Sequence, residues 1–226
     1  MKKRSALVLG ATGLVGGYCL RYLLDEPMYT RVAVLARKPI TIQHEKLVHL
    51  VADFDECEAL GDWMTADDVF CCLGTTIKKA GSQDAFRRVD FDYTIKLAAL
   101  TQHCGARQFL IVTSLGADSH SRIFYSRVKG EIEDALRKVP FNALHIFRPS
   151  LLIGVRPEHR TSEIAGMLFL SGLKYAMTGP LKKYRTIRAS DVARAMVGVA
   201  LWDMSGIRVY ESNQIQELAD SFKNIK

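Results

Sequence analysis

A glycine-rich turn directly follows the first apolar segment of the chain. The segment Ala6-Leu7-Val8-Leu9 runs into Gly10, and glycines recur at Gly13 and Gly16, where an amphipathic segment begins. Glycines also mark ordinary turns, but a strand before them and a helix after them indicate a phosphate-binding loop. In such a loop the first glycine permits a tight turn, the second lets the backbone approach a pyrophosphate, and the third lets the helix and the strand pack closely. The helix N-terminus adds amide donors and a favourable dipole. The expected cofactor-binding residues of this loop are Gly10, Thr12, Gly13, Leu14, Val15 and Gly16.

Short runs rich in Val, Ile and Leu alternate with longer segments of helical period along the rest of the chain. This alternation is typical of β-α-β units whose parallel strands are covered on both faces. We therefore expect an α/β fold: a doubly wound parallel Rossmann sheet of about seven strands with helices on both faces and a small C-terminal flap. The predicted strands are 5–10, 31–36, 46–51, 68–73, 107–113, 142–147 and 207–211, and the predicted helices are 14–25, 55–63, 84–104, 122–138, 161–171, 189–203 and 213–222.

The sequence favours a single domain over residues 1–226. No linker rich in Pro, Gly or Ser divides the 226 residues, and no internal repeat is visible. The stretch 148–188 is less regular and carries several prolines and glycines, so we expect it to form a substrate-side flap over the crevice of the sheet.

The chain is basic, with 31 Lys and Arg against 24 Asp and Glu and a net charge of +7. Such a charge suits an anionic partner, but the basic residues are dispersed and are not interleaved with aromatic residues, so we expect no nucleic-acid partner. The basic group 182–185 leaves contact with nucleic acid or acidic lipid open as a lesser alternative. Glycines interrupt the apolar stretch after the N-terminal basic residues, which disfavours a signal peptide, and no later segment reaches the ~18 apolar residues of a membrane span.

Five cysteines without a C-x-x-C pair predict reduced thiols and a cytoplasmic location, because a chain of this size needs no disulfide framework. Adjacent Cys71 and Cys72 lie in an apolar run and are expected to be buried structural thiols. The six histidines show no metal-ligand spacing, so no metal site is predicted.

The end of the second predicted strand bears on the choice of nicotinamide cofactor. It ends in Ala36-Arg37-Lys38, without the acidic residue that would bind the adenosine ribose of NAD. Arg37 and Lys38 instead suit the 2′-phosphate of NADP, so we expect NADP(H) to be preferred over NAD(H); an ordinary solvated pair is the alternative. Further candidates follow the third and fourth strands. Asp53 and Phe54 are expected to line the adenine, with a simple helix cap by Asp53 as the alternative. Gly74, Thr75 and Thr76 either lie beside the cofactor or form a plain turn.

A candidate catalytic set lies in the middle of the chain. Ser114 follows an apolar strand that is expected to end at the crevice, and Tyr125 and Lys129 lie on the next helix. Their separation of four residues places both side chains on one helical face, where an ammonium group is expected to lower the pKa of the phenol and to bind the nicotinamide ribose. Ser114 would then hold a substrate oxygen while Tyr125 transfers a proton. A Tyr-x-x-x-Lys pair also occurs on helices without function, so the prediction depends on its combination with Ser114 and the glycine loop.

These motifs together resemble the short-chain dehydrogenase/reductase superfamily over nearly the whole chain. The segments Thr113-Ser114-Leu115-Gly116-Ala117, Tyr125-Ser126-Arg127-Val128-Lys129-Gly130-Glu131 and Arg148-Pro149-Ser150 are most similar to its atypical, Tat-interacting-protein-like branch. The resemblance implies NADP(H) binding and a reductase activity, and it places Arg148, Pro149 and Ser150 beside the nicotinamide end. Members of this branch also include cofactor-dependent binding proteins.

Two features depart from the related reductases. Asp90 lies in a region where such enzymes often carry an Asn that aids the proton relay, so its role is open. Fewer than eighty residues follow Arg148, which disfavours a nucleotide-sugar substrate.

The first hypothesis is an NADP(H)-dependent oxidoreductase for a small carbonyl or alcohol. The alternative is a non-catalytic NADP(H)-binding regulatory module with a protein partner, and either would be a monomer or a homodimer.

Overall fold

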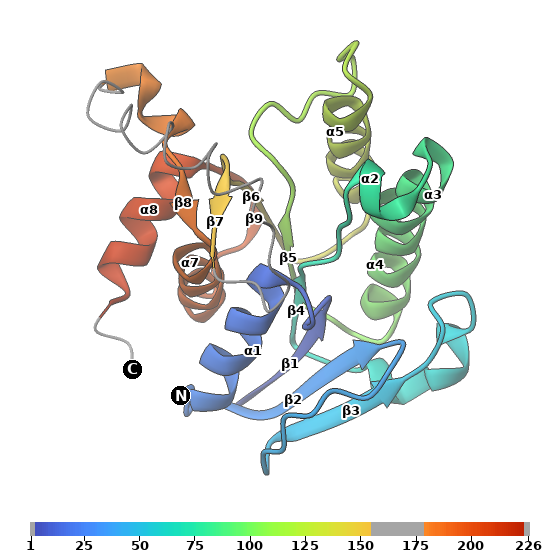
Figure 1. Ribbon diagram of the computed structural model, residues 1–226. Helices are drawn as coiled ribbons and strands as arrows, with labels where there is room; N and C mark the ends of the chain where they lie inside the picture. Colours follow the sequence, from blue (N-terminus) through green and yellow to red (C-terminus); the bar gives the residue numbers. More distant parts are fainter. Residues whose placement is uncertain (1–2, 155–178, 224–226) are drawn as a thin grey trace.

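The computed structural model describes residues 3–154 and 179–223, and within them seven parallel strands form one sheet (Figure 1). The strand order is β3-β2-β1-β4-β5-β6-β9, so the sequence-based expectation of a doubly wound parallel sheet is confirmed. The chain leaves β1 toward one side of the sheet and returns at β4 on the other, which creates a crevice at the carboxyl ends of the strands. The strands are β1 Arg4–Leu9, β2 Tyr29–Ala36, β3 Leu47–Val51, β4 Asp68–Cys71, β5 Gln108–Val112, β6 Ala143–Arg148 and β9 Gly206–Glu211.

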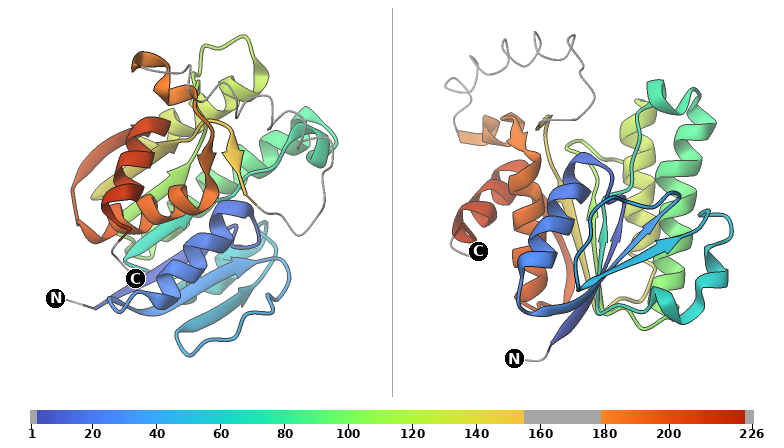
Figure 2. Two further views of the ribbon diagram at one scale, coloured as in Figure 1. Left: turned by 60° about the vertical axis from the view of Figure 1, so that its left-hand side comes forward. Right: turned by 60° about the horizontal axis from the view of Figure 1, so that its bottom comes forward.

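Helices cover both faces of this sheet (Figure 2). Residues of β1 alternate between two apolar cores, with Ala6 and Val8 in one and Leu7 and Leu9 in the other, because successive side chains of a strand point to opposite faces. The first core contains α1 Leu14–Asp25, α7 Ala189–Leu201 and α8 Ser212–Ser221; the second contains the 3₁₀ segment η1 Cys57–Met64, α4 Tyr93–His103 and α5 Phe124–Leu136.

The predicted continuous helix 84–104 is wrong in one respect. After a short helix α2 (Ile77–Ala80), the chain forms α3 (Gln83–Arg87), then the π-helical turn η2 (Arg88–Asp92), and only then α4. A π turn inserts an extra residue into the helix and so changes which side chains face inward. Asp90 lies in this π turn and is buried, and the inward face of α4 that follows carries Leu97 and Ala98 together with two buried threonines.

The predicted helix 55–63 is also corrected, since the chain forms η1 there instead. Gly61 adopts φ +46°, ψ −126° inside this segment, which is not helical. The remaining helices differ from the expected ranges only at their ends.

The predicted flap 148–188 is described only at its two ends. The predicted helix 161–171 lies outside the described residues. At the ends, β7 (Leu152–Ile153) and β8 (Ile187–Arg188) pair in parallel after the 3₁₀ segment η4 (Gly179–Tyr184). Gly154 packs on the start of α1, where an added Cβ would lie 2.8 Å from Cδ1 of Leu14. The flap therefore begins against the glycine loop.

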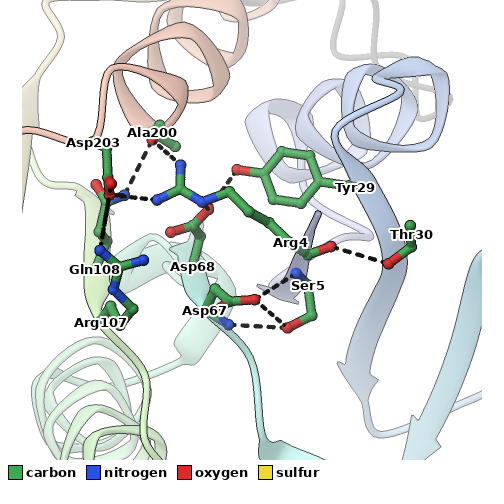
Figure 3. A network of polar contacts seen from close by, with 10 residues as sticks. All are labelled: Arg4, Ser5, Tyr29, Thr30, Asp67, Asp68, Arg107, Gln108, Ala200 and Asp203. Atoms are coloured by element: carbon green, nitrogen blue, oxygen red, sulfur yellow. Dashed lines mark hydrogen bonds and ion pairs between the residues drawn. The ribbon is translucent and has the colours of Figure 1, made fainter. Parts of the chain in front are cut away.

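A buried polar network lies at the amino ends of the central strands, opposite the crevice (Figure 3). Arg4 donates to the carbonyl oxygen of Ala200 at 2.7 Å and to Asp203 at 2.5 Å, and its Nε lies 3.5 Å from Asp68. The hydroxyl of Tyr29 donates to the same Asp68 carboxylate at 2.7 Å. The network thus ties β1, β2 and β4 to the end of α7.

Over the part of the chain that the structure describes, no helix is long and apolar enough to cross a membrane. Within the same residues, His, Cys, Asp and Glu side chains do not gather in groups of three suited to a metal ion.

Candidate functional site

The glycine loop is held close to the end of β4. Gly10 adopts φ +83°, a backbone conformation that residues with a Cβ atom rarely adopt. A Cβ atom on Gly10 would lie 2.6 Å from the carbonyl oxygen of Cys72, and one on Gly16 would overlap the carbonyl oxygen of Gly10. The loop therefore has room for backbone atoms but not for side chains at these two positions.

The N-terminus of α1 is open to an anion. Gly13 is its N-cap residue and provides no side-chain cap, and the first turn of the helix holds no acidic residue. Gly13 and Thr12 are exposed, whereas Val15 and Gly16 are buried beneath the loop. Unsatisfied amide groups at a helix N-terminus are suited to a diphosphate. The loop thus fits the dinucleotide that its sequence predicts.

The predicted adenosine-side residues lie at the ends of β2 and β3. Arg37 and Lys38 are exposed just beyond β2, and neither forms an ion pair with the residues that the structure describes. Asp53 is exposed and accepts a hydrogen bond from the Asp55 amide at 3.1 Å, so it stabilises the local turn. The ring of Phe54 is buried and packs edge-on against Tyr93 at 5.3 Å, which directs it into the core.

The turn after β4 connects the crevice to the π turn. The Thr75 amide donates to Oδ2 of Asp90 at 2.9 Å. Thr76 caps α2, since its hydroxyl accepts from the Lys79 amide at 3.1 Å. Gly74 is exposed, and a Cβ atom there would lie 3.5 Å from Oδ1 of Asp90. This turn therefore borders a buried carboxylate.

Ser114 follows β5, in a loop that folds back on α5. The Asp118 amide donates to the Ser126 carbonyl oxygen at 3.1 Å, and Gly130 lies so close to this loop that an added Cβ would overlap Asp118 and Ser119. The Oγ atom of Ser114 is buried and has no hydrogen-bond partner among the described residues. An unpaired buried hydroxyl is costly in a folded protein, and a bound ligand oxygen would satisfy it.

Tyr125 and Lys129 occupy the expected face of α5. Tyr125 is 37% exposed, and its ring centroid lies 5.9 Å from the Lys129 ammonium. Lys129 itself is buried, and its Nζ donates to Oδ1 of Asp90 at 2.6 Å. Burial alone would lower the pKa of Lys129, but the attraction of Asp90 and the hydrogen bond to it raise that pKa above its ordinary value. Lys129 is therefore a buried cation that forms an ion pair with Asp90.

Glu133, one turn beyond Lys129, holds the strand ends behind the site. It is 1% exposed and accepts hydrogen bonds from the Thr113 hydroxyl at 2.8 Å and from Nε of Arg148 at 2.9 Å. This contact draws the Arg148 guanidinium toward α5. The Pro149 carbonyl oxygen accepts from the Leu115 amide at 2.9 Å, next to Ser114.

Ser150 is directed elsewhere, because its hydroxyl contacts the Arg185 carbonyl oxygen and the Ser212 hydroxyl. Of the triplet 148–150, Pro149 therefore contacts the residue that follows Ser114, and Arg148 contacts α5 through Glu133.

The sequence-based prediction missed Glu133 and left Asp90 without a role. Glu133 had a detectable signal, because it continues the four-residue spacing of Tyr125 and Lys129 along one face of α5. Asp90 had none, since only the π turn determines that this carboxylate points inward.

This fold and this site define a family. Residues 10–201 match the family model described as NAD(P)H-binding, so the chain belongs to this NAD(P)H-binding family of atypical short-chain dehydrogenases/reductases and epimerases. Among curated relatives, Protein HTATIP2 of Rattus norvegicus is 36% identical over 177 residues, which cover 76% of this chain and 73% of that protein. Protein fmp52, mitochondrial, of Aspergillus clavatus is 31% identical over 206 residues, which cover 88% of each chain.

Solved structures show the same fold at low sequence identity. The human epimerase family protein SDR39U1 with NADPH superposes with a TM-score of 0.63 at 18% identity, covering 92% of this chain and 74% of that one. MoeE5 in complex with UDP-glucose and NAD gives a TM-score of 0.66 at 16% identity, covering 97% and 82%. These similarities confirm the Rossmann-like architecture and carry no statement about the substrate of this chain.

Proposed function

We propose that the protein is an NADP(H)-dependent oxidoreductase acting on a small carbonyl or alcohol, with Ser114, Tyr125 and Lys129 as its catalytic residues. The observation that carries the proposal is the buried, unpaired Oγ of Ser114, in a loop that packs on the helix bearing Tyr125 and Lys129. A substrate oxygen is a suitable partner for that hydroxyl.

The residues of the chain have separable roles in this proposal. The bound nicotinamide supplies or accepts the hydride. Ser114 donates a hydrogen bond to the substrate oxygen and fixes its position. Tyr125 gives a proton to that oxygen during reduction and removes it during oxidation. Lys129 keeps a positive charge beside the ribose and the phenol.

The proposed preference for NADP(H) depends on Arg37 and Lys38. Their side chains are exposed where β2 ends, beside the glycine loop that follows β1, and the described residues offer them no competing carboxylate. A 2′-phosphate at this position would form charge-assisted hydrogen bonds with them.

Conversion of Tyr125 to Phe tests the catalytic role. Purified wild-type protein and Tyr125→Phe are assayed with NADPH against a panel of aldehydes and ketones, and NADPH binding is measured in parallel. We expect turnover to fall by at least about 10²-fold, the usual contribution of acid-base catalysis, with binding nearly unchanged. Tyr18→Phe, on α1, is the matched control. Equal turnover by wild type and Tyr125→Phe would refute the assignment.

A second candidate function is a non-catalytic, NADP(H)-responsive binding module. The observation that favours it is the Lys129–Asp90 ion pair, because the Asp90 carboxylate competes with the phenol of Tyr125 for the ammonium group that a reductase would use to assist proton transfer. The test is affinity capture with apo and NADPH-loaded protein. A protein partner bound in only one of these states would support this function, and an identical set of partners in both would contradict it.

We further propose that residues 1–226 act as one domain, as a monomer or a homodimer, in the cytoplasm. The described cysteines are all free thiols, which is consistent with a reducing compartment. A fungal relative is named as mitochondrial, so the proposed cytoplasmic location needs a direct test. Organelle fractionation of cells that express the chain is the deciding measurement.

A further inference from the structure

Asp90 is the buried group at the site to which the catalytic proposal assigns no step. Its side chain is fully buried, and both carboxylate oxygens are used. Oδ1 accepts from the Lys129 ammonium at 2.6 Å, and Oδ2 accepts from the Thr75 amide at 2.9 Å. Asp90 therefore connects the turn after β4 to α5, the two segments on either side of the expected nicotinamide ribose.

The surroundings of the pair explain why a carboxylate is needed there. Lys129 is buried, and an ammonium group without a countercharge would lose its proton in such surroundings. The other titratable groups acting on it are Tyr125 on α5 and Cys71 at the end of β4, and the burial of Cys71 raises the pKa of its thiol to about 12. Asp90 is the carboxylate in direct contact with the ammonium, so it provides the countercharge.

We infer that Asp90 is a positioning residue for the cofactor: its negative charge keeps Lys129 cationic and fixed beside the Thr75 turn, so that the ammonium binds the nicotinamide ribose over a wide pH range. The inference rests on the proposed ribose contact of Lys129 and not on turnover. It predicts a property that a merely structural role would not produce, namely an NADPH affinity that becomes dependent on pH when the charge of Asp90 is removed.

The test is the pH profile of NADPH binding, followed by nicotinamide fluorescence between pH 6.5 and 9. In wild type Lys129 is expected to stay protonated over this range, so it should cause no change of NADPH affinity with pH. In Asp90→Asn the burial of Lys129 is no longer compensated, so its pKa falls and the affinity drops by about tenfold as the pH rises and the charge is lost. Asp90→Glu, which restores the charge, is expected to recover the flat profile.

Three controls make the result specific. Asp92→Asn changes an exposed carboxylate of the same π turn and is expected to leave the profile unchanged. Lys129→Met is expected to weaken binding equally at every pH. The double variant Asp90→Asn with Lys129→Met is expected to show no more pH dependence than Lys129→Met.

A second readout needs no cofactor. Pulsed acetylation of the apo protein at pH 8, with mass spectrometry of the Lys129 peptide, is expected to be faster in Asp90→Asn than in wild type, because neutral amines react. The inference is overturned if Asp90→Asn keeps the wild-type profile or weakens binding equally at all pH values. It is likewise overturned if Lys129 acetylation is unchanged. Absence of turnover would refute the proposed reductase and leave these results intact.

Discussion

The backbone of Gly10 lies against that of Cys72, so that a Cβ atom on Gly10 would approach the Cys72 carbonyl oxygen to 2.6 Å. This contact joins the first and fourth strands at the base of the cofactor loop. Gly10→Ala is therefore expected to lower the free energy of unfolding by more than ~1 kcal/mol and to abolish the stabilisation by NADPH, because φ is +83° and the new methyl group displaces the loop. Thermal unfolding with and without NADPH measures both effects.

Gly81 provides the matched control for this prediction. It adopts φ +90°, but a Cβ atom there would meet nothing within 4 Å. Gly81→Ala should thus lower the free energy of unfolding through backbone strain, but the protein should still be stabilised by NADPH. An undiminished NADPH shift in Gly10→Ala would contradict the assigned role of the loop.

Arg37→Ala is expected to weaken NADPH binding by about tenfold or more and to leave NADH binding unchanged, since a hydrogen bond to a charged group contributes roughly 1.5–3 kcal/mol. Isothermal titration with both cofactors is the measurement. Arg21→Ala, on the exposed side of α1, is the control for a general loss of positive charge. Equal losses for NADPH and NADH would remove the argument for a 2′-phosphate contact.

Asp68 is expected to make the stability of the protein depend on pH. Burial raises the pKa of this carboxyl to about 6, although the hydrogen bond from Tyr29 and the charge of Arg4 act in the opposite direction. Its pKa in the unfolded chain is about 3.9, so the folded state binds more protons between these values. The contribution of Asp68 to the free energy of unfolding is therefore fully present below pH ~4 and is lost as the pH rises through ~6, by about 1 kcal/mol between pH 5 and 7.

Comparison of wild type with Asp68→Asn in urea isolates this effect. The comparison is needed because His145 titrates in the same range with the opposite sign. Burial and the charge of Arg208 lower the pKa of His145 to about 4, so its contribution is lost as the pH falls from ~6.5. Parallel stability curves for wild type and Asp68→Asn between pH 5 and 7 would show that Asp68 is ionised throughout.

Glu133→Gln is expected to lower the free energy of unfolding by about 3 kcal/mol, because it leaves the Arg148 guanidinium without the carboxylate that it contacts in the interior. Urea unfolding measures the loss. Asp134→Asn, one residue along the same helix, is the control: its side chain is 57% exposed and its contact with Arg137 is 3.9 Å long, so a change below about 0.5 kcal/mol is expected. Similar losses in the two variants would argue against the Glu133 network.

The local pattern of the chain was sufficient for the architecture. Glycine spacing predicted the loop at Gly10, and the apolar runs predicted all seven strands of the main sheet, because a strand buried on both faces must be almost wholly apolar. The four-residue spacing of Tyr125 and Lys129 likewise predicted their common face on α5.

The partners of the charged side chains were beyond such patterns. Lys129 and Asp90 are 39 residues apart, and Glu133 and Thr113 are 20 apart. Helical period and strand alternation predict which residues are neighbours within one helix or strand. These pairs depend instead on how separate elements pack against each other. They also depend on a π turn that no residue type in the sequence predicts. The apolar pattern of each helix and strand therefore determines the fold and can be read from the sequence. The ionic contacts of the site form only after segments that are distant in the sequence have packed together and excluded water.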